Sequence, residues 1–128
     1  MKILLDTHAM LWCFSDPDSL SQKAAEAFLD SGNNLFLSAA SYWEICLKIS
    51  IGKLSLDRHW EKTIDRELSR NSIQWLNLEK PHFIGVINLP WVHRDPFDRI
   101  LVAQAVCEHM TIMTSDENIR QYKVKTIW

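Results

Sequence analysis

The stretch Lys2-Ile3-Leu4-Leu5-Asp6-Thr7 decides the class of fold, because a short apolar run ends at a carboxylate. The run predicts a buried strand over residues 2–5. Helical patterning follows until Ser15-Asp16-Pro17-Asp18, whose composition predicts a break. A strand that leads directly into a helix is typical of α/β proteins, in which such units repeat.

The rest of the chain repeats this order of strand and helix. The alternation predicts an α/β protein, a three-layer α/β/α sandwich with a mostly parallel sheet. No internal repeat, linker or low-complexity segment divides the chain, so residues 1–128 are expected to form one domain. Further strands are expected at 35–37, 73–78, 111–113 and 124–127, and helices at 22–30, 59–69, 80–88, 97–109 and from Ser38 or Ser41 to Gly52.

The composition is that of a soluble globular protein, with 47% hydrophobic and 23% charged residues. Its apolar stretches are short and broken by charges, so no segment is expected to span a bilayer. The apolar run before Asp6 is also too short for the hydrophobic region of a secretion signal. The protein is therefore expected in the cytoplasm, with Cys13, Cys46 and Cys107 as reduced, buried thiols.

The formal net charge of −2 restricts how the chain can bind nucleic acid. Proteins that hold nucleic acid by bulk electrostatics are usually strongly basic. If this chain acts on nucleic acid, it requires a local basic patch, bound cations or the help of a partner.

Four acidic residues occupy positions where a carboxylate has chemical consequences. Asp6 follows the first strand, and Asp116 follows the strand at 111–113. Ligands of open parallel sheets bind beyond the carboxyl ends of the strands, where the strand order reverses, so these two acids meet if their strands are neighbours. Glu44 lies in an apolar helical segment, where a charge is costly to bury without a partner. Asp98 lies in the first turn of its helix, where the helix dipole favours a carboxylate.

Each acid also has a simpler explanation on its own. Asp6 can end the strand or cap the following helix, and Asp116 can begin a turn. Glu44 can pair with Lys48 four residues later, and first-turn acids such as Asp98 are common. The case for chemistry depends on convergence, because carboxylates brought together repel unless a divalent cation neutralises them. Hard cations such as Mg²⁺ prefer oxygen ligands, and such a site supports phosphodiester hydrolysis.

Several blocks of the sequence resemble the PIN-domain nucleases, and specifically the VapC-type toxins of bacterial toxin–antitoxin pairs. The blocks follow the order of the family and span nearly the whole chain. They are Leu4-Leu5-Asp6-Thr7-His8, Ser38-Ala39-Ala40-Ser41-Tyr42-Trp43-Glu44-Ile45, Gly52-Lys53-Leu54, His93-Arg94-Asp95-Pro96-Phe97-Asp98-Arg99-Ile100 with Ala103-Gln104-Ala105, and Thr114-Ser115-Asp116.

The resemblance implies a compact sandwich whose acidic cluster binds Mg²⁺ or Mn²⁺ and cleaves single-stranded regions of RNA. Carried over residue by residue, the metal-binding and catalytic acids are Asp6, Glu44 and Asp98, with Asp116, in the loosest block, as the fourth. Asp95 is expected to cap the helix that follows it rather than to bind metal. The implied protein partner is a separate antitoxin chain, bound to a homodimer or a larger toxin–antitoxin assembly.

The mechanism expected from this site is hydrolysis by a metal-activated water that attacks in line, leaving 5′-phosphate and 3′-hydroxyl ends. Neighbouring side chains are expected to support the site rather than to react. Thr7, Ser38 and Thr114 would hold the carboxylates or cap helices, Lys48 and Arg99 would pair with the acids or contact phosphate, His8 and His93 would be structural or border the substrate, and Trp12, Trp43 and Trp75 fall in apolar patterns expected in the core.

Three alternatives stand beside an active nuclease. A catalytically inactive PIN-like binding module would be expected to lack some of the acids. A phospho-receiver-type α/β domain would need paired acids after the first strand and a phosphorylatable Asp at the end of a middle strand. A phosphoryl-aspartate hydrolase would need a second Asp two residues after Asp6, where this chain has His8. Metal-dependent RNase activity separates the nuclease from all three.

Overall fold

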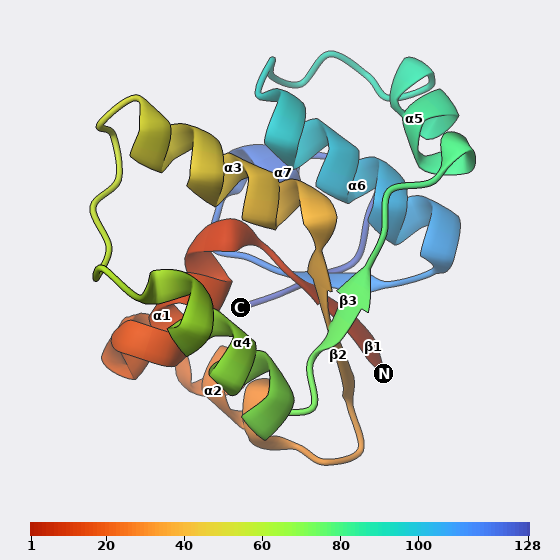
Figure 1. Ribbon diagram of the computed structural model, residues 1–128. Coiled ribbons are helices and arrows are strands. Elements are labelled where there is room, and N and C mark those ends of the chain that lie inside the picture. Colours follow the sequence, from red (N-terminus) through yellow and green to blue (C-terminus); the bar gives the residue numbers. More distant parts are fainter.

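A computed structural model describes all 128 residues, which form a parallel sheet between two layers of helices (Figure 1). The elements are β1 (Lys2–Leu5), α1 (Thr7–Ser15), the 3₁₀ helix η1 (Pro17–Ser19), α2 (Gln22–Leu29), β2 (Asn34–Ser38), α3 (Ala39–Ser50), α4 (Trp60–Arg70), β3 (Gln74–Leu76), α5 (Lys80–Ile87), α6 (Pro96–Glu108), β4 (Thr111–Met113), α7 (Glu117–Arg120) and β5 (Thr126–Ile127).

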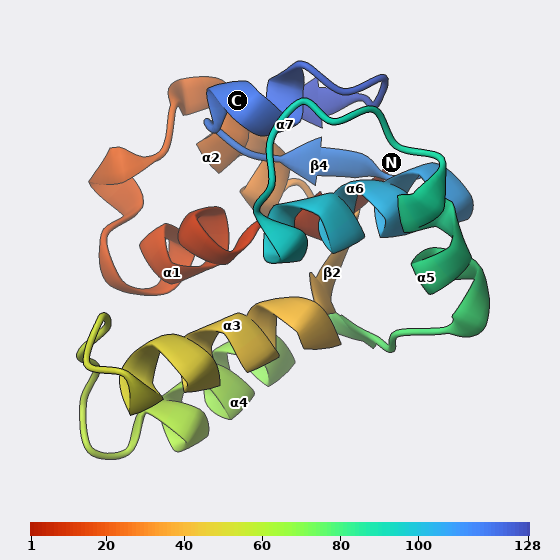
Figure 2. The same ribbon diagram turned by 90° about the horizontal axis from the view of Figure 1, so that it is seen from above.

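The sheet separates two hydrophobic clusters because successive side chains of a strand point to opposite faces. On β1, Ile3 and Leu5 belong to one cluster and Leu4 to the other. Helices α1, α2 and α4 pack on the first face, whereas α6 and α7 cover the second (Figures 1 and 2). Helix α3 contributes to both clusters and contacts both α1 and α6. The predicted three-layer α/β/α sandwich is confirmed.

The order of strands in the sheet is β3-β2-β1-β4-β5, and every neighbouring pair is parallel. The chain runs outward from β1 through β2 to β3 and then crosses to β4 on the other side of β1. The order therefore reverses between β1 and β4, and ligands of such sheets bind beyond the carboxyl ends of the strands at this point. The backbone N–H of Asp6 donates to the carbonyl of Met113 at 3.2 Å, which joins the two strand ends.

The central strands β1 and β4 have the predicted bounds, whereas the outer elements differ by a few residues. Strands β3 and β5 are shorter than predicted because they are the edge strands, with a partner on one side only. Residues 117–120 form the short helix α7 where the sequence predicts only a turn. None of the helices combines the length and apolar character that crossing a membrane requires.

The prediction that Trp43 and Trp75 lie in the core is wrong. Trp43 is 59% exposed and Trp75 is 46% exposed. Helix α3 buries the face that carries Ala40 and Ile45 instead, because small residues there allow close packing on the sheet and α6. Trp43 lies on the outside, where its ring packs edge-on against Phe97 at 5.0 Å.

The prediction of buried thiols is also wrong for two of the three cysteines. All three are free, but Cys46 and Cys107 are exposed and Cys13 is only partly buried. Both exposed cysteines lie on the outer faces of their helices, α3 and α6, whose inner faces fill the core without them.

Gly52 follows the end of α3 with φ of +74°, a left-handed conformation that a side chain disfavours. Gly52→Ala is therefore expected to lower the free energy of unfolding by about 1–2 kcal/mol. Gly85→Ala is the matched control. Gly85 lies within α5, and the added Cβ would be at an ordinary contact distance of 3.4 Å from the Cβ of Ala103 on α6. Urea denaturation should show a loss for the first variant and none for the second, and equal effects would contradict the role of the conformation.

Candidate active site

Asp6 ends β1 and caps α1, so its position is set by two elements at once. Its Oδ1 accepts a hydrogen bond from the backbone N–H of Ala9 at 2.6 Å, and the residue is only 6% exposed. Burial raises the pKa of Asp6, and the charge of Asp116 raises it further. Hydrogen bonds from Thr114 and Ala9 and the nearby His8 oppose the increase in this pKa. Capping alone does not explain a buried carboxylate that lies beside a second acid.

Glu44 is buried on the inner face of α3 and both of its oxygens have partners. Thr7 Oγ1 donates to Oε1 at 2.6 Å, and Lys48 Nζ donates to Oε2 at 2.5 Å. This hydrogen bond with Glu44 raises the pKa of Lys48, and the charges of Glu44, Asp95 and Asp98 add to the increase. The predicted pairing of Lys48 with an acid is confirmed. The charges of Asp95 and Asp98, at the start of α6, also act on the lysine.

Asp98 lies in the first turn of α6, whose N-cap is Asp95. Asp95 Oδ1 accepts from the backbone N–H groups of Phe97 and Asp98 at 2.9 and 3.2 Å, as predicted for a cap. The side chain of Asp98 contacts His93 instead, with 3.0 Å between Oδ2 and Nε2. Burial raises the pKa of Asp98 to about 6. The hydrogen bond from His93 lowers this pKa, whereas the negative charges of Asp95 and Asp116 raise it further.

Asp116 follows β4 and caps α7, where its Oδ1 accepts from the backbone N–H of Asn118 at 2.7 Å. Its own backbone N–H donates to Thr114 Oγ1 at 3.0 Å. The charge of Asp116 raises the pKa of both Asp6 and Asp98, so this acid acts electrostatically on both. The loosest of the four predicted positions therefore belongs to the same electrostatic cluster.

Asp6 and Asp116 follow the two strands at the switch point of the sheet, and the charge of Asp116 acts on Asp6 and on Asp98. Glu44 is linked to Asp98 through the charge of Lys48. Lys48 is the one basic side chain that forms an ion pair with any of the four acids, apart from the His93 contact to Asp98. The acids share no tight geometry, since none of them belongs to a group of three ligand atoms within 4.8 Å of one another. An all-oxygen donor set with unneutralised charge fits Mg²⁺ or Mn²⁺, which proteins usually hold through one or two carboxylates with waters completing the shell.

The structure separates the side chains that were predicted to support the acids. Thr7 hydrogen-bonds to Glu44, and Thr114 does so to Asp6. Ser38 does not, because its hydroxyl caps α3 and donates to Gln104. The prediction that Arg99 pairs with the acids or contacts phosphate is wrong, because its guanidinium is buried and donates to backbone carbonyls such as that of Pro90 and to the hydroxyl of Tyr122.

A hollow of about 390 Å³ lies next to Glu44 and Lys48. Two further basic side chains border it, His8 from α1 and Lys53 from the segment after α3. The hollow therefore places two lysines and a histidine beside Glu44, in a chain of net charge −2. A local basic patch is one of the three means of binding nucleic acid that the charge balance left open, beside bound cations and a partner.

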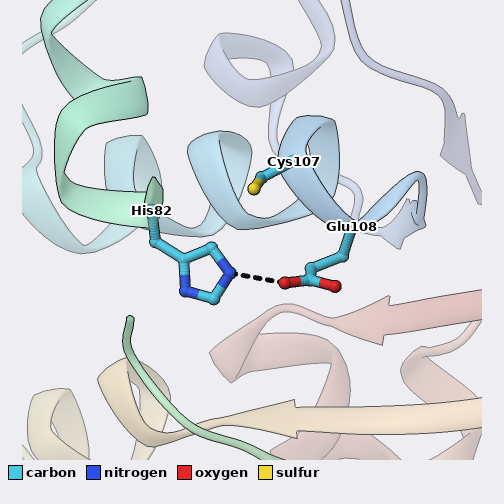
Figure 3. Close-up of side chains that lie close together, drawn as sticks. All are labelled: His82, Cys107 and Glu108. Atoms are coloured by element: carbon cyan, nitrogen blue, oxygen red, sulfur yellow. Dashed lines mark hydrogen bonds and ion pairs between the residues drawn. The ribbon is translucent and has the colours of Figure 1, made fainter. Parts of the chain in front are cut away.

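His82, Cys107 and Glu108 form the tightest group of metal-ligating side chains, but their hydrogen bonds argue against a metal (Figure 3). Nδ1 of the buried His82 accepts from the backbone N–H of Glu79 at 3.0 Å, so the ring proton of the neutral imidazole is on Nε2. Nε2 lies 2.8 Å from Glu108 Oε1 and donates to it. A metal bound to Nε2 would have to displace the Nε2 proton and break its hydrogen bond to Glu108. The group is therefore a structural link between α5 and α6.

Sequence reasoning missed the partner of His93. Its Nδ1 lies 2.8 Å from the hydroxyl of Tyr122, a buried residue after α7. No local pattern points to Tyr122, because the tyrosine is far from Asp98 in sequence and the sheet alone brings the two segments together.

Comparison with known proteins gives a family match over nearly the whole chain. The model of the PIN domain family matches residues 3–125. No curated protein is significantly similar in sequence.

The fold is similar to chains in three solved structures. VapBC2 from Rickettsia felis, bound to a DNA fragment from its promoter, gives a TM-score of 0.75 at 13% identity, over 98% of this chain and 97% of that one. DNA-bound VapBC from Salmonella typhimurium gives 0.68 at 14% identity, over 98% and 96%. VapBC-1 from nontypeable Haemophilus influenzae gives 0.61 at 16% identity, over 98% and 96%.

Proposed function

The chain belongs to the PIN domain family, and from this premise we propose that it is a divalent-metal-dependent endoribonuclease and the toxin of a toxin–antitoxin pair. One observation carries the proposal: four acids from separate elements are linked electrostatically near the point where the strand order reverses, and a single lysine, Lys48, is ion-paired to one of them, Glu44. A structural role for the acids would not require this repulsive arrangement, since separate caps stabilise their helices equally well.

Asp6, Glu44 and Asp98, with Asp116 as the fourth acid, would hold Mg²⁺ or Mn²⁺. When bound, the ion supplies a lowered pKa for water and a positive charge next to the phosphate. The chain supplies the orientation: the α1 cap holds Asp6, and Thr7 holds Glu44. No histidine base is needed at this site.

RNA is the proposed substrate because two lysines and a histidine border a hollow beside Glu44. Lys48, Lys53 and His8 border the hollow next to Glu44 and would contact phosphates of a bound strand. The narrow extent of this basic patch suits a single strand better than a duplex, whose two backbones need a wider footprint.

An antitoxin and a second copy of the chain are the proposed protein partners, and the cytoplasm the proposed location. The similar folds occur in VapBC complexes, and this chain exposes large apolar side chains that a partner would cover. Among them are Trp43 on α3, Ile51 directly after α3 and Ile87 at the end of α5. An antitoxin that inserted a basic residue among the acids would also neutralise the site.

Incubation of the purified chain with total RNA tests the proposed activity. We expect cleavage with Mg²⁺ or Mn²⁺, none with EDTA, and recovery when excess Mn²⁺ is added back, since the acids need a cation. The products should carry 5′-phosphate ends and duplex RNA should resist. Cleavage that survives EDTA would contradict metal dependence, whereas a chain that binds Mn²⁺ but cuts no RNA would be an inactive binding module.

A further inference from the structure

We propose that Tyr122 and His93 are positioning residues for the carboxylate of Asp98. Buried Arg99 donates a hydrogen bond to Tyr122, Tyr122 donates to His93, and His93 donates to Asp98. The inference depends on the proposed function, because it assigns Asp98 to the metal site. The two residues would not touch the RNA or the ion. Their role is to hold one carboxylate oxygen so that the other is presented to the cation.

The series of hydrogen bonds begins at Arg99, which is 3% exposed. Its Nη1 lies 2.8 Å from the carbonyl oxygen of Pro90 and 3.0 Å from the hydroxyl of Tyr122. A guanidinium has only N–H donors, so the Tyr122 oxygen must accept from it. The single proton of the tyrosine hydroxyl is then free to point elsewhere.

That proton has one partner, His93 Nδ1 at 2.8 Å. Because Nδ1 accepts, a neutral His93 carries its proton on Nε2. Nε2 lies 3.0 Å from Asp98 Oδ2 and donates to it. The donor sequence Arg99, Tyr122, His93, Asp98 gives every hydrogen in the series an acceptor, whereas a proton on Nδ1 would leave the Tyr122 hydroxyl hydrogen without one.

Burial protects this series of hydrogen bonds from water. Tyr122 is 4% exposed, and the side chains of His93 and Asp98 are 14% and 18% exposed, so little water competes for the hydrogen bonds. The guanidinium of Arg99 also packs over the ring of Trp91 at 4.1 Å, which holds the charged end of the chain in place.

The same hydrogen bonds exclude two other roles for His93. Both ring nitrogens are occupied, so the imidazole has no free lone pair for the metal or for a proton of the attacking water. Hydrogen bonds of this kind to a metal-binding group typically change metal affinity about 10–100-fold when they are removed. His93 therefore acts through Asp98.

Mn²⁺ titration by calorimetry on the full chain tests the proposal with Tyr122→Phe, which deletes only the hydroxyl. We expect its Mn²⁺ affinity to fall about tenfold. Tyr42→Phe is the matched control, because Tyr42 lies on α3 and its hydroxyl makes no hydrogen bond. His93→Gln keeps an N–H donor and should retain more affinity than His93→Ala.

The metal-free protein provides a second measurement. Long-range ¹⁵N–¹H NMR spectra should show neutral His93 with its proton on Nε2, which a purely packing role would not require. A proton on Nδ1, or a Tyr122→Phe affinity equal to that of Tyr42→Phe, would overturn the proposal. If Asp6→Asn binds Mn²⁺ as well as the wild type, the metal site is wrong; if only Asp6→Asn loses affinity, the metal site stands and the positioning role fails.

Discussion

Asp6→Asn is expected to reduce RNA cleavage at least about 100-fold, since loss of a direct ligand should exceed the 10–100-fold cost of losing a supporting hydrogen bond. The amide is neutral and a poor ligand for a hard cation. The fold should survive, because asparagine caps helices as well as aspartate and its Oδ1 can accept from Ala9 N–H as Asp6 does. Single-turnover cleavage with Mg²⁺ measures the loss, and circular dichroism checks the fold.

Asp18→Asn is the matched control for the charge change, because Asp18 is an exposed acid in η1 with no part in the site. It should cleave RNA at the wild-type rate. Full activity of Asp6→Asn would refute the assignment of the site, and equal losses in both variants would show that net charge alone governs activity.

Asp98→Asn is expected to abolish cleavage and, at neutral pH in EDTA, to stabilise the protein. Burial holds the pKa of Asp98 at about 6 instead of 3.8, so the folded chain binds this proton more tightly than the unfolded chain. The wild type therefore loses stability as the pH rises through this interval, and above it the charged carboxylate destabilises the fold. At about 1.4 kcal/mol per pKa unit the variant should gain roughly 1–3 kcal/mol.

Urea unfolding at pH 4 and pH 7.5 in EDTA measures this difference. The two proteins should be nearly equal at the lower pH, and the remaining pH dependence of the variant should reflect Asp6, whose pKa is also raised by burial. Saturating Mn²⁺ should reverse the order, because ligand binding stabilises the wild type. A variant no more stable than the wild type at pH 7.5 in EDTA would contradict the claim that the buried, charged carboxylate of Asp98 destabilises the fold.

The central strands and the ends at which acids lie were predictable from the sequence because their signals are local. An apolar run that stops at Asp6 and another that stops just before Thr114 mark buried parallel strands, and both were found with the predicted bounds. The cap at Asp95 was equally local, since it depends on the residue itself and the turn that follows.

The face of α3 was not predictable in the same way. Trp43 and Ile51 recur at helical spacing, but so do Ala40 and Glu44, and periodicity alone does not say which set faces inward. The choice depends on how closely the helix can approach the sheet, which smaller side chains favour. The exposed cysteines follow from the same choice of face on α3 and α6.

The sequence by itself determined the class of fold, the central strands and the four acids, because each depends on residues next to one another in the chain. Tertiary structure alone decided the strand order that brings Asp6 and Asp116 together, the burial that raises the pKa of Asp98, and the link from Tyr122 to His93. The physical reason is that desolvation and hydrogen-bond direction depend on neighbours in space, and strand crossing makes neighbours of residues that lie far apart in the chain.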